Sequence, residues 1–348
     1  MSIAIRSFAK INLGLRIGPP RADGFHELRT VYQTIALRDV VRVEAEPGEG
    51  IEIRCDDPRV PCDATNTCYK ITERVLKSAG KRSKVVITID KQLPVQGGMG
   101  AASSNAVGAM LGLERALGIE LAPQDKLCIA AEVGSDLPLF LIGGTVLGVD
   151  RGQEVYALQD LPEMSLVVVT PAMGVSTPKA FAQWDALVAE ANTEEAIDIA
   201  SAEIAQSALT VPNVTGTIKK FDQALYAWWG KSLLSQARAA EGPASGVPAL
   251  GGDRAETPLL DLVRTGIEND FERVVFPEYP ELREVKSVLQ REGARYASLS
   301  GSGSTLYGLF DSANGANAAA EHVRAAGYAT VATRTVTRNE YWNQLFVG

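Results

Sequence analysis

A glycine-rich segment over residues 94–105 carries the strongest chemical signal in this sequence: Pro-Val-Gln-Gly-Gly-Met-Gly-Ala-Ala-Ser-Ser-Asn. It follows a strand pattern and precedes a helical one. Glycines let a backbone turn tightly and bring its N–H groups to a ligand, while the start of a helix adds unpaired donors and a positive dipole. With the hydroxyls of Ser103 and Ser104, this pattern predicts a phosphate-binding loop. The segment lacks the Gly-Lys-Ser/Thr of a Walker A loop and the third glycine of a dinucleotide fingerprint. A serine-capped turn is the alternative.

Two charged residues, Lys10 and Asp136, lie within apolar surroundings and therefore need partners. Lys10 interrupts an apolar strand pattern, where an aspartate or a phosphate would serve as its partner. Asp136 precedes the apolar residues 137–140, predicted to lead into a strand, and partial desolvation there would suit a carboxylate acting as a base. An aspartate that only terminates a helix is the alternative. The sequence alone does not bring the two residues together.

A second glycine loop, Ser-Gly-Ser-Gly-Ser over residues 300–304, separates two predicted strands. Taken alone it is a generic turn. Two loops of the phosphate-binding type in one chain point more strongly to a phosphorylated ligand than either loop does alone.

Composition narrows the class of protein. The 348 residues are 46% hydrophobic and 22% charged, which predicts a globular chain of two domains or one large one. The net charge of −8 disfavours a nucleic-acid or membrane-surface binder but leaves room for an anionic substrate. The presence of only two histidines nearly excludes histidine-rich metal sites and most histidine-based triads.

Cysteine spacing and the N-terminus indicate a reducing compartment. None of the four cysteines forms a C-x-x-C pair, so reduced structural thiols are expected, although three within fourteen residues leave zinc as an alternative. Charged residues interrupt the N-terminal apolar stretch, so no signal peptide is predicted. The longest apolar run, 137–149, contains a proline and three glycines and is too short to span a bilayer. We therefore expect a cytoplasmic protein.

The elements that must position these residues follow from hydrophobic periodicity and turn signals. Strands are predicted over 3–17, 27–36, 40–46, 51–54, 84–91, 143–149 and 166–170, and helices over 66–79, 103–117, 123–134 and 279–292. The last part reads strand, glycine turn, strand, helix over 314–326, strand. Between 186 and 258 there are helical patches at 193–208 and 217–234 and an exposed or disordered loop at 238–257. Because strands and helices do not strictly alternate, the class is α+β.

Together these segments resemble the GHMP kinase superfamily: Lys10 with its flank resembles the first motif, residues 94–105 the second, which binds ATP, and residues 299–304 the third. They are most similar to the branch that phosphorylates 4-diphosphocytidyl-2-C-methyl-D-erythritol. The blocks that carry this similarity are Ala9-Lys10-Ile-Asn12-Leu, Arg21-Ala-Asp23-Gly24-Phe25-His26-Glu27-Leu, Gly97-Gly98-Met-Gly100-Ala-Ala-Ser103-Ser104-Asn105-Ala, Gly134-Ser-Asp136-Leu-Pro138, Gly174-Val-Ser176-Thr177, Asn269-Asp270-Phe-Glu272 and Ser300-Gly-Ser-Gly-Ser304. They span residues 9 to about 310 in the order of that branch.

The resemblance implies a two-domain GHMP kinase fold of the α+β class. An N-terminal ribosomal-protein-S5-domain-2-like domain over residues 1–160 would carry the ATP loop. A C-terminal ferredoxin-like α/β-sandwich domain over 161–348 would carry an insertion at about 190–258. The active site would lie in the cleft between them.

The activity that the resemblance implies is transfer of the γ-phosphate of ATP, with Mg²⁺, to the 2-hydroxyl of 4-diphosphocytidyl-2-C-methyl-D-erythritol, in non-mevalonate isoprenoid precursor biosynthesis. Asp136 would be the base and Lys10 would hold it ionised and neutralise charge near the transferred group. The ATP-binding residues would be Asn66, Pro94, Val95, Gln96, Gly97, Gly98, Met99, Gly100, Ala101, Ala102, Ser103 and Ser104, with Ser104 as the candidate Mg²⁺ contact. The enzyme would be a monomer or homodimer with a small-molecule substrate and no nucleic-acid or membrane partner.

For the cytidyl group the resemblance implies an aromatic clamp made by Phe25 and Phe181, with His26 on the edge of the base. Further substrate contacts would come from Asn12, Thr177, Gly301 and Ser302. The departures from the pattern are small: Phe25 for a common tyrosine, Met99 for leucine, and alanines at 101–102 where glycines are common.

Two other readings remain. Another GHMP-type kinase, of the homoserine or mevalonate type, need not carry the Ala-Asp-Gly-Phe-His block. A non-catalytic ligand-binding relative would be expected to lose Lys10 or Asp136, and both are present.

Overall fold

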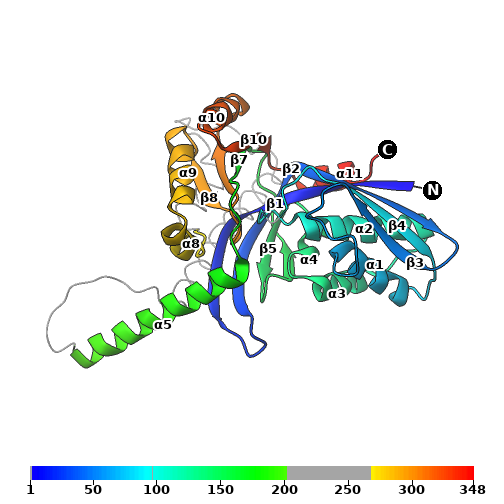
Figure 1. The fold of residues 1–348 in the computed structure, drawn as a ribbon, viewed down its shortest axis with the longest axis horizontal. Coiled ribbons are helices and arrows are strands. Elements are labelled where there is room, and N and C mark those ends of the chain that lie inside the picture. The colour runs from blue at the N-terminus through cyan, green and yellow to red at the C-terminus, as the bar shows by residue number, and fades with distance from the viewer. Residues whose placement is uncertain (1, 96, 202–267) are drawn as a thin grey trace, which may run out of the picture.

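The computed structural model describes residues 2–95, 97–201 and 268–348. Gln96, the predicted helix over 217–234, the predicted loop over 238–257 and most of the predicted insertion lie outside these residues. The described residues form two sheets, each covered by helices, that pack against each other (Figure 1).

The first sheet is built around one long antiparallel hairpin of β1 and β2, whose register runs from Ser2 opposite Glu44 to Pro20 opposite His26. The second half of β2 also pairs with β4, and its first half pairs with β5. Strand β2 therefore pairs with β1 along its length and with a further strand in each half. The order is β3-β4-β2-β5-β6, with β1 on β2, and only β3 and β4 are parallel. The strands are β1 (Ser2–Pro20), β2 (His26–Glu46), β3 (Gly50–Cys55), β4 (Lys84–Asp90), β5 (Thr145–Val149) and β6 (Glu154–Ala157).

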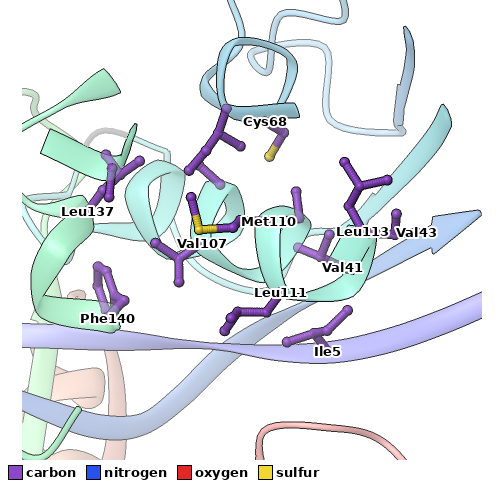
Figure 2. Close-up of a cluster of buried hydrophobic side chains, with 14 of the residues drawn as sticks. Ile5, Val41, Val43, Cys68, Val107, Met110, Leu111, Leu113, Leu137 and Phe140 are labelled. Atoms are coloured by element: carbon purple, nitrogen blue, oxygen red, sulfur yellow. The ribbon is translucent and has the colours of Figure 1, made fainter. Parts of the chain in front are cut away.

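Four helices cover one face of this sheet: α1 (Thr67–Ser78), α2 (Ala101–Leu117), α3 (Pro123–Val133) and α4 (Leu137–Phe140). Helix α2 lies directly on β1 and β2 because Gly112 faces the sheet. A Cβ atom at Gly112 would lie 2.5 Å from Ile5 Cδ1 and 2.8 Å from Val43 Cγ2. Figure 2 shows the resulting core, in which Val107 and Met110 of α2 lie among side chains of the sheet and of α1 and α4. The packing of α2 on the sheet therefore positions the start of α2 and the glycine loop that precedes it.

The second sheet has the antiparallel order β10-β7-β9-β8. Val167 and Val169 of β7 face a helical layer, while Leu166 and Val168 face the first sheet. The elements of this half are β7 (Ser165–Thr170), α5 (Thr177–Ser201), α8 (Glu272–Glu278), α9 (Pro280–Arg291), β8 (Tyr296–Leu299), β9 (Leu306–Phe310), α10 (Ala313–Ala325) and β10 (Ala329–Arg334). Helices α8, α9 and α10 lie on the outer side of the sheet (Figure 1).

A third core joins the two sheets. It holds Ile11 and Leu13 of β1 against Tyr307 and Leu309 of β9, all of them buried. The last helix, α11 (Arg338–Gln344), returns to the first sheet, beside the N-terminus of the chain (Figure 1). Residues 338–347 thus pack with the first sheet although they follow the second in sequence.

The α+β class is confirmed, and most predicted elements match the observed ones. Several differ. The predicted strands over 27–36 and 40–46 are one strand, and the apolar residues after Asp136 form the short helix α4. Helices α8 and α11, strand β6 and the part of α5 before residue 193 were not predicted. Pro138 favours the helical turn of α4 because its fixed φ suits a first turn. In the part of the chain that the structure describes, no helix is long and apolar enough to cross a bilayer.

Candidate active site

Two cavities meet at the glycine loop that precedes α2. The first cavity, of about 350 Å³, is lined by the start of α1, by Lys91 and by the loop itself. The second cavity, of about 630 Å³, lies between the β1–β2 hairpin, the start of α5 and the 300–303 loop. Gly98 and Gly100 line both cavities. The loop is therefore a shared wall of the two cavities.

Glycine is required at two positions of this wall. Gly98 and Gly100 have φ values of 76° and 68°, a region that side chains rarely adopt. A Cβ atom at Gly98 would collide with the carbonyl oxygen of Ser300, and one at Gly100 would lie 3.1 Å from Lys10 Cγ. The hydroxyl of Ser300 donates to Gly98 O at 3.1 Å. The loop is therefore pressed between the 300–303 loop and Lys10.

Lys10 and Asp136 form an ion pair in the second cavity. Lys10 Nζ lies 3.3 Å from Asp136 Oδ2, with the Lys10 side chain 4% and the Asp136 side chain 33% exposed. The ammonium also donates to Asn12 Oδ1 at 2.7 Å, because residues two apart on a strand lie on the same face. The phenol of Tyr32 donates to Asp136 Oδ1 at 3.1 Å. Both oxygens of this carboxylate therefore have a partner, while a third of its side chain stays open to the cavity.

The 300–303 loop is held beside this pair by Asn269. Asn269 Nδ2 donates to Leu299 O and to Gly301 O, both at 2.8 Å. A Cβ atom at Gly301 would lie 3.7 Å from Lys10 Nζ. The hydroxyls of Thr177 and Ser302 are 2.6 Å apart, which ties the start of α5 to the same loop. These contacts bring Gly301, Ser302 and Thr177 to the second cavity.

The far end of the second cavity is aromatic. The rings of His26 and Phe181 stack with centroids 4.9 Å apart, and His26 Nε2 lies 2.7 Å from Asp185 Oδ1. Phe25 is 50% exposed, and the Arg151 guanidinium lies 4.9 Å from its ring centroid. All the predicted substrate residues line this cavity. The sequence did not foresee that His26 lies against Phe181, with Nε2 already engaged by Asp185.

In the first cavity the structure places the predicted loop residues from Pro94 to Ser103, apart from Gln96, which lies outside the described residues. Asn66 also lines it, but its amide serves the fold: Oδ1 caps α1 by accepting from Cys68 N, and Nδ2 donates to Pro61 O.

Ser104 is the exception among the predicted ATP-loop residues. It is 2% exposed, lines neither cavity, and its hydroxyl lies 2.8 Å from the hydroxyl of Ser7. The prediction that Ser104 contacts a metal is therefore corrected, because helical geometry turns its side chain toward the sheet. Ser103, one residue earlier, does line the first cavity.

A buried carboxylate that the sequence analysis missed fixes both ends of the glycine loop. Asp39 is fully buried and accepts from the backbone N–H groups of Gln92 and Leu93, both at 2.7 Å. It also accepts from Asn105 Nδ2 at 3.1 Å and pairs with Lys91. The only local signal was an acidic residue inside a β-rich segment. Tyr32, Arg151 and Asp185 were missed because nothing in their local sequence distinguishes them.

Comparisons with known proteins agree with this arrangement. The model of the GHMP kinases N terminal domain matches residues 66–144 and that of the GHMP kinases C terminal region matches 256–329. The 4-diphosphocytidyl-2-C-methyl-D-erythritol kinase of Acaryochloris marina is 30% identical over 325 residues, 92% of this chain and 91% of the relative. That of Solibacter usitatus is 32% identical over 89% of this chain and 82% of its own length.

Solved structures show the same fold. A crystal structure of 4-(cytidine 5'-diphospho)-2C-methyl-D-erythritol kinase superposes with a TM-score of 0.65 at 25% identity, covering 95% of this chain and 98% of that one. A mevalonate kinase superposes with a TM-score of 0.62 at 12% identity, covering 97% and 99%, a likeness of fold alone.

The two sheets, the shared glycine wall and these matches define a GHMP kinase, a phosphotransferase that uses ATP. Within that class the chain belongs to the family of 4-diphosphocytidyl-2-C-methyl-D-erythritol kinases, because relatives of that name match it over nearly its whole length.

Proposed function

We propose that this chain transfers the γ-phosphate of ATP to the 2-hydroxyl of 4-diphosphocytidyl-2-C-methyl-D-erythritol. The observation that carries the proposal is the position of the Lys10–Asp136 pair, which lies in the second cavity against the glycine wall shared with the first. ATP in the first cavity and a hydroxyl acceptor in the second would meet at that wall. The names of the relatives supply the identity of the acceptor.

ATP binding rests on the loop and on the start of α2. The loop backbone offers N–H donors, and the 17-residue helix α2 directs its positive end toward the same cavity. The triphosphate would follow the loop from Gly97 to Ser103. The nucleoside would then lie against Pro94, Val95 and Asn66, which also line the first cavity.

Asp136 is the proposed base. As the acceptor oxygen bonds to the γ-phosphorus, the bond from that phosphorus to the bridging oxygen breaks and ADP leaves. The hydroxyl proton passes to Asp136 Oδ2 and then to solvent through the open part of the cavity. The Lys10 ammonium, beside Oδ2, offsets the negative charge that gathers on the transferred group. Phosphoryl transfer depends mainly on such positioning and charge stabilisation.

Mg²⁺ is proposed as the companion of ATP. The described residues contain no group of three acidic, histidine or cysteine side chains that could cage a metal. This fits Mg²⁺, which is commonly held by phosphates and water with one or two protein oxygens. The Ser103 hydroxyl is the side-chain oxygen that the start of α2 presents to the first cavity. The ion would neutralise phosphate charge during transfer.

The cytidyl group is assigned to the aromatic end of the second cavity. Stacking on Phe25 and Phe181 is worth roughly 1–3 kcal/mol per base. The stack of His26 on Phe181 fixes the position of the Phe181 ring before substrate binds. Substrate binding therefore carries little entropy cost for ordering this side chain. Asn12, Thr177, Gly301 and Ser302 would contact the polyol and phosphates nearer the Lys10–Asp136 pair.

A coupled assay of ADP release tests the proposal. The purified chain with ATP and Mg²⁺ is expected to turn over 4-diphosphocytidyl-2-C-methyl-D-erythritol at least a hundredfold faster, in kcat/KM, than homoserine or mevalonate. Faster turnover of homoserine or mevalonate would overturn it.

A further inference from the structure

Tyr32 lies in a slot that two glycines keep open. It belongs to β2, is 2% exposed, and packs against the β5 side of the first sheet. A Cβ atom at Gly148 would lie 2.5 Å from Tyr32 Cε2, and one at Gly152 would lie 2.6 Å from the Tyr32 hydroxyl oxygen. The space that a larger residue would fill at either position is therefore taken by the phenol ring.

From this slot the phenol contacts both members of the ion pair. Its hydroxyl donates to Asp136 Oδ1 at 3.1 Å, and Lys10 Nζ lies 5.4 Å from its ring centroid, within the range of a cation–π contact. Burial raises the pKa of the Tyr32 phenol well above its usual range, and the negative charge of Asp136 raises it further. The phenol is therefore neutral and remains a donor throughout the pH range in which a kinase works.

We propose that Tyr32 is a positioning residue for phosphoryl transfer, which acts by holding Asp136 Oδ1 so that Oδ2, beside Lys10, is the oxygen that takes the acceptor proton. This inference rests on the function proposed above. The ring acts separately, through its cation–π contact with the Lys10 ammonium.

Two partners face the Asp136 carboxylate from neighbouring elements, Lys10 from β1 and Tyr32 from β2. The other charged or titratable side chains that line the same cavity are Arg151, Asp185 and His26. None of these three has a hydrogen bond or ion pair to Asp136 among the contacts of the described residues, so removal of the phenol hydroxyl changes the surroundings of Asp136 selectively.

The substitution Tyr32→Phe keeps the ring in its slot and removes only the hydroxyl. We expect kcat to fall about tenfold, as for loss of one hydrogen bond to a charged group. The KM values for ATP and for the cytidyl substrate should stay within twofold. Because only the hydrogen bond that fixes Asp136 Oδ1 is lost, the effect should fall on kcat and not on either KM.

Tyr341→Phe is the matched control. Tyr341 is also a buried phenol, and it donates to Phe140 O at 2.6 Å. Loss of its hydroxyl should lower the melting temperature as much as Tyr32→Phe does and leave kcat within twofold. An unchanged kcat in Tyr32→Phe, or an equal fall in Tyr341→Phe, would overturn the proposal.

A second readout needs no substrate. In the enzyme labelled with ¹³C at the aspartate carboxyls, the Asp136 signal is the one lost in Asp136→Asn. The chemical shift of this signal should differ between Tyr32→Phe and the unsubstituted chain, because the hydrogen bond to Oδ1 is lost. An unmoved signal counts against the role of Tyr32 whatever the acceptor is, whereas failure to phosphorylate the cytidyl substrate counts against the proposed function alone.

Discussion

At the scale of single residues, the reacting centre is a small cluster in which each polar group has a defined partner. Lys10 from β1, Tyr32 from β2 and Asp136 from the turn before α4 meet in the second cavity. A buried lysine that faced only apolar side chains would be costly, and Asp136 and Asn12 remove that cost. The open third of the Asp136 side chain is what distinguishes a carboxylate available to substrate from a purely structural ion pair.

The first prediction concerns the proposed base. Asp136→Asn should lower kcat by about three orders of magnitude, because an amide cannot accept the hydroxyl proton. ATP affinity should be unchanged, since Asp136 lines the second cavity and not the first. Steady-state ADP release and calorimetric binding of a non-hydrolysable ATP analogue measure the two quantities. Asp125→Asn, an exposed aspartate in the first turn of α3, is the control. A kcat within tenfold of the original chain would remove Asp136 from the mechanism.

The second prediction separates substrate stacking from packing at Phe181. Phe181→Ala should raise the KM for the cytidyl substrate by about tenfold to a hundredfold, because a stacking face worth roughly 1–3 kcal/mol is lost. The KM for ATP should stay within twofold, since Phe181 is remote from the first cavity. Both values come from the same coupled assay. Equal rises in the two KM values would instead make Phe181 a packing partner of His26 and Phe271.

At the scale of elements, the glycine loop owes its position to groups outside it. Asp39 on β2 binds the backbone just before the loop and the Asn105 amide just after it. The loop conformation that the glycines permit is therefore selected by one buried carboxylate. Glycine content alone could predict a tight turn but not the direction in which its N–H groups point.

The third prediction follows from that anchor. Asp39→Asn keeps an oxygen for Gln92 and Leu93 but leaves Lys91 without its carboxylate. The free energy of unfolding should fall by about 3 kcal/mol, the usual cost of breaking a buried pair on one side. The KM for ATP should rise several-fold because the loop is less fixed. Urea unfolding and the coupled assay measure both. Glu52→Gln, which breaks an exposed pair with Arg54, should change neither. An unchanged KM for ATP would mean that the loop is held by its other contacts.

The sequence predicts features that depend on neighbouring residues in the chain, and it does not predict contacts that depend on the tertiary packing of distant segments. The glycine loop, its flanking strand and helix, and the shared face of Lys10 and Asn12 could all be predicted, because each depends on neighbours in the chain. The meeting of Lys10, Tyr32 and Asp136 could not, because it depends on strand pairing and on how α4 packs.

Two features that were not predicted, the burial of Ser104 and helix α11, nevertheless have local signals in the sequence. Ser104 lies on the same helical face as the buried Val107 and Leu111, a spacing that predicts burial. Helix α11 is preceded by the N-cap residue Thr337, whose hydroxyl accepts from the N–H of Glu340, the residue pattern of a capping box.

At the scale of the whole molecule, the two cavities differ in what builds them. The first cavity is lined only by residues from the half of the molecule that contains the first sheet. The second also takes Thr177, Phe271 and Ser302 from the other half. The third core sets how these halves lie, and the Tyr307 hydroxyl reinforces it by donating to Asn12 O at 2.7 Å, two residues from Lys10. The packing between the sheets is therefore part of the acceptor site. It also reaches the ATP loop, because Met99 belongs to the third core and Ser300 donates to Gly98 O.

The last prediction tests the packing between the sheets with two buried leucines. Leu309→Ala removes a side chain of the third core, and Leu113→Ala removes one of the core between α2 and the first sheet, both with 0% exposure. Each should lower the free energy of unfolding by about 2–5 kcal/mol, measured in urea. Only Leu309→Ala loosens the packing between the sheets, to which Met99 of the ATP loop also belongs, so only this variant should raise the KM for the cytidyl substrate and the KM for ATP several-fold. The rise of the two KM values is the discriminating quantity because both variants carry a similar loss of stability. If Leu113→Ala raised them as much as Leu309→Ala, general loosening of the fold, and not the packing between the two sheets, would control the two sites.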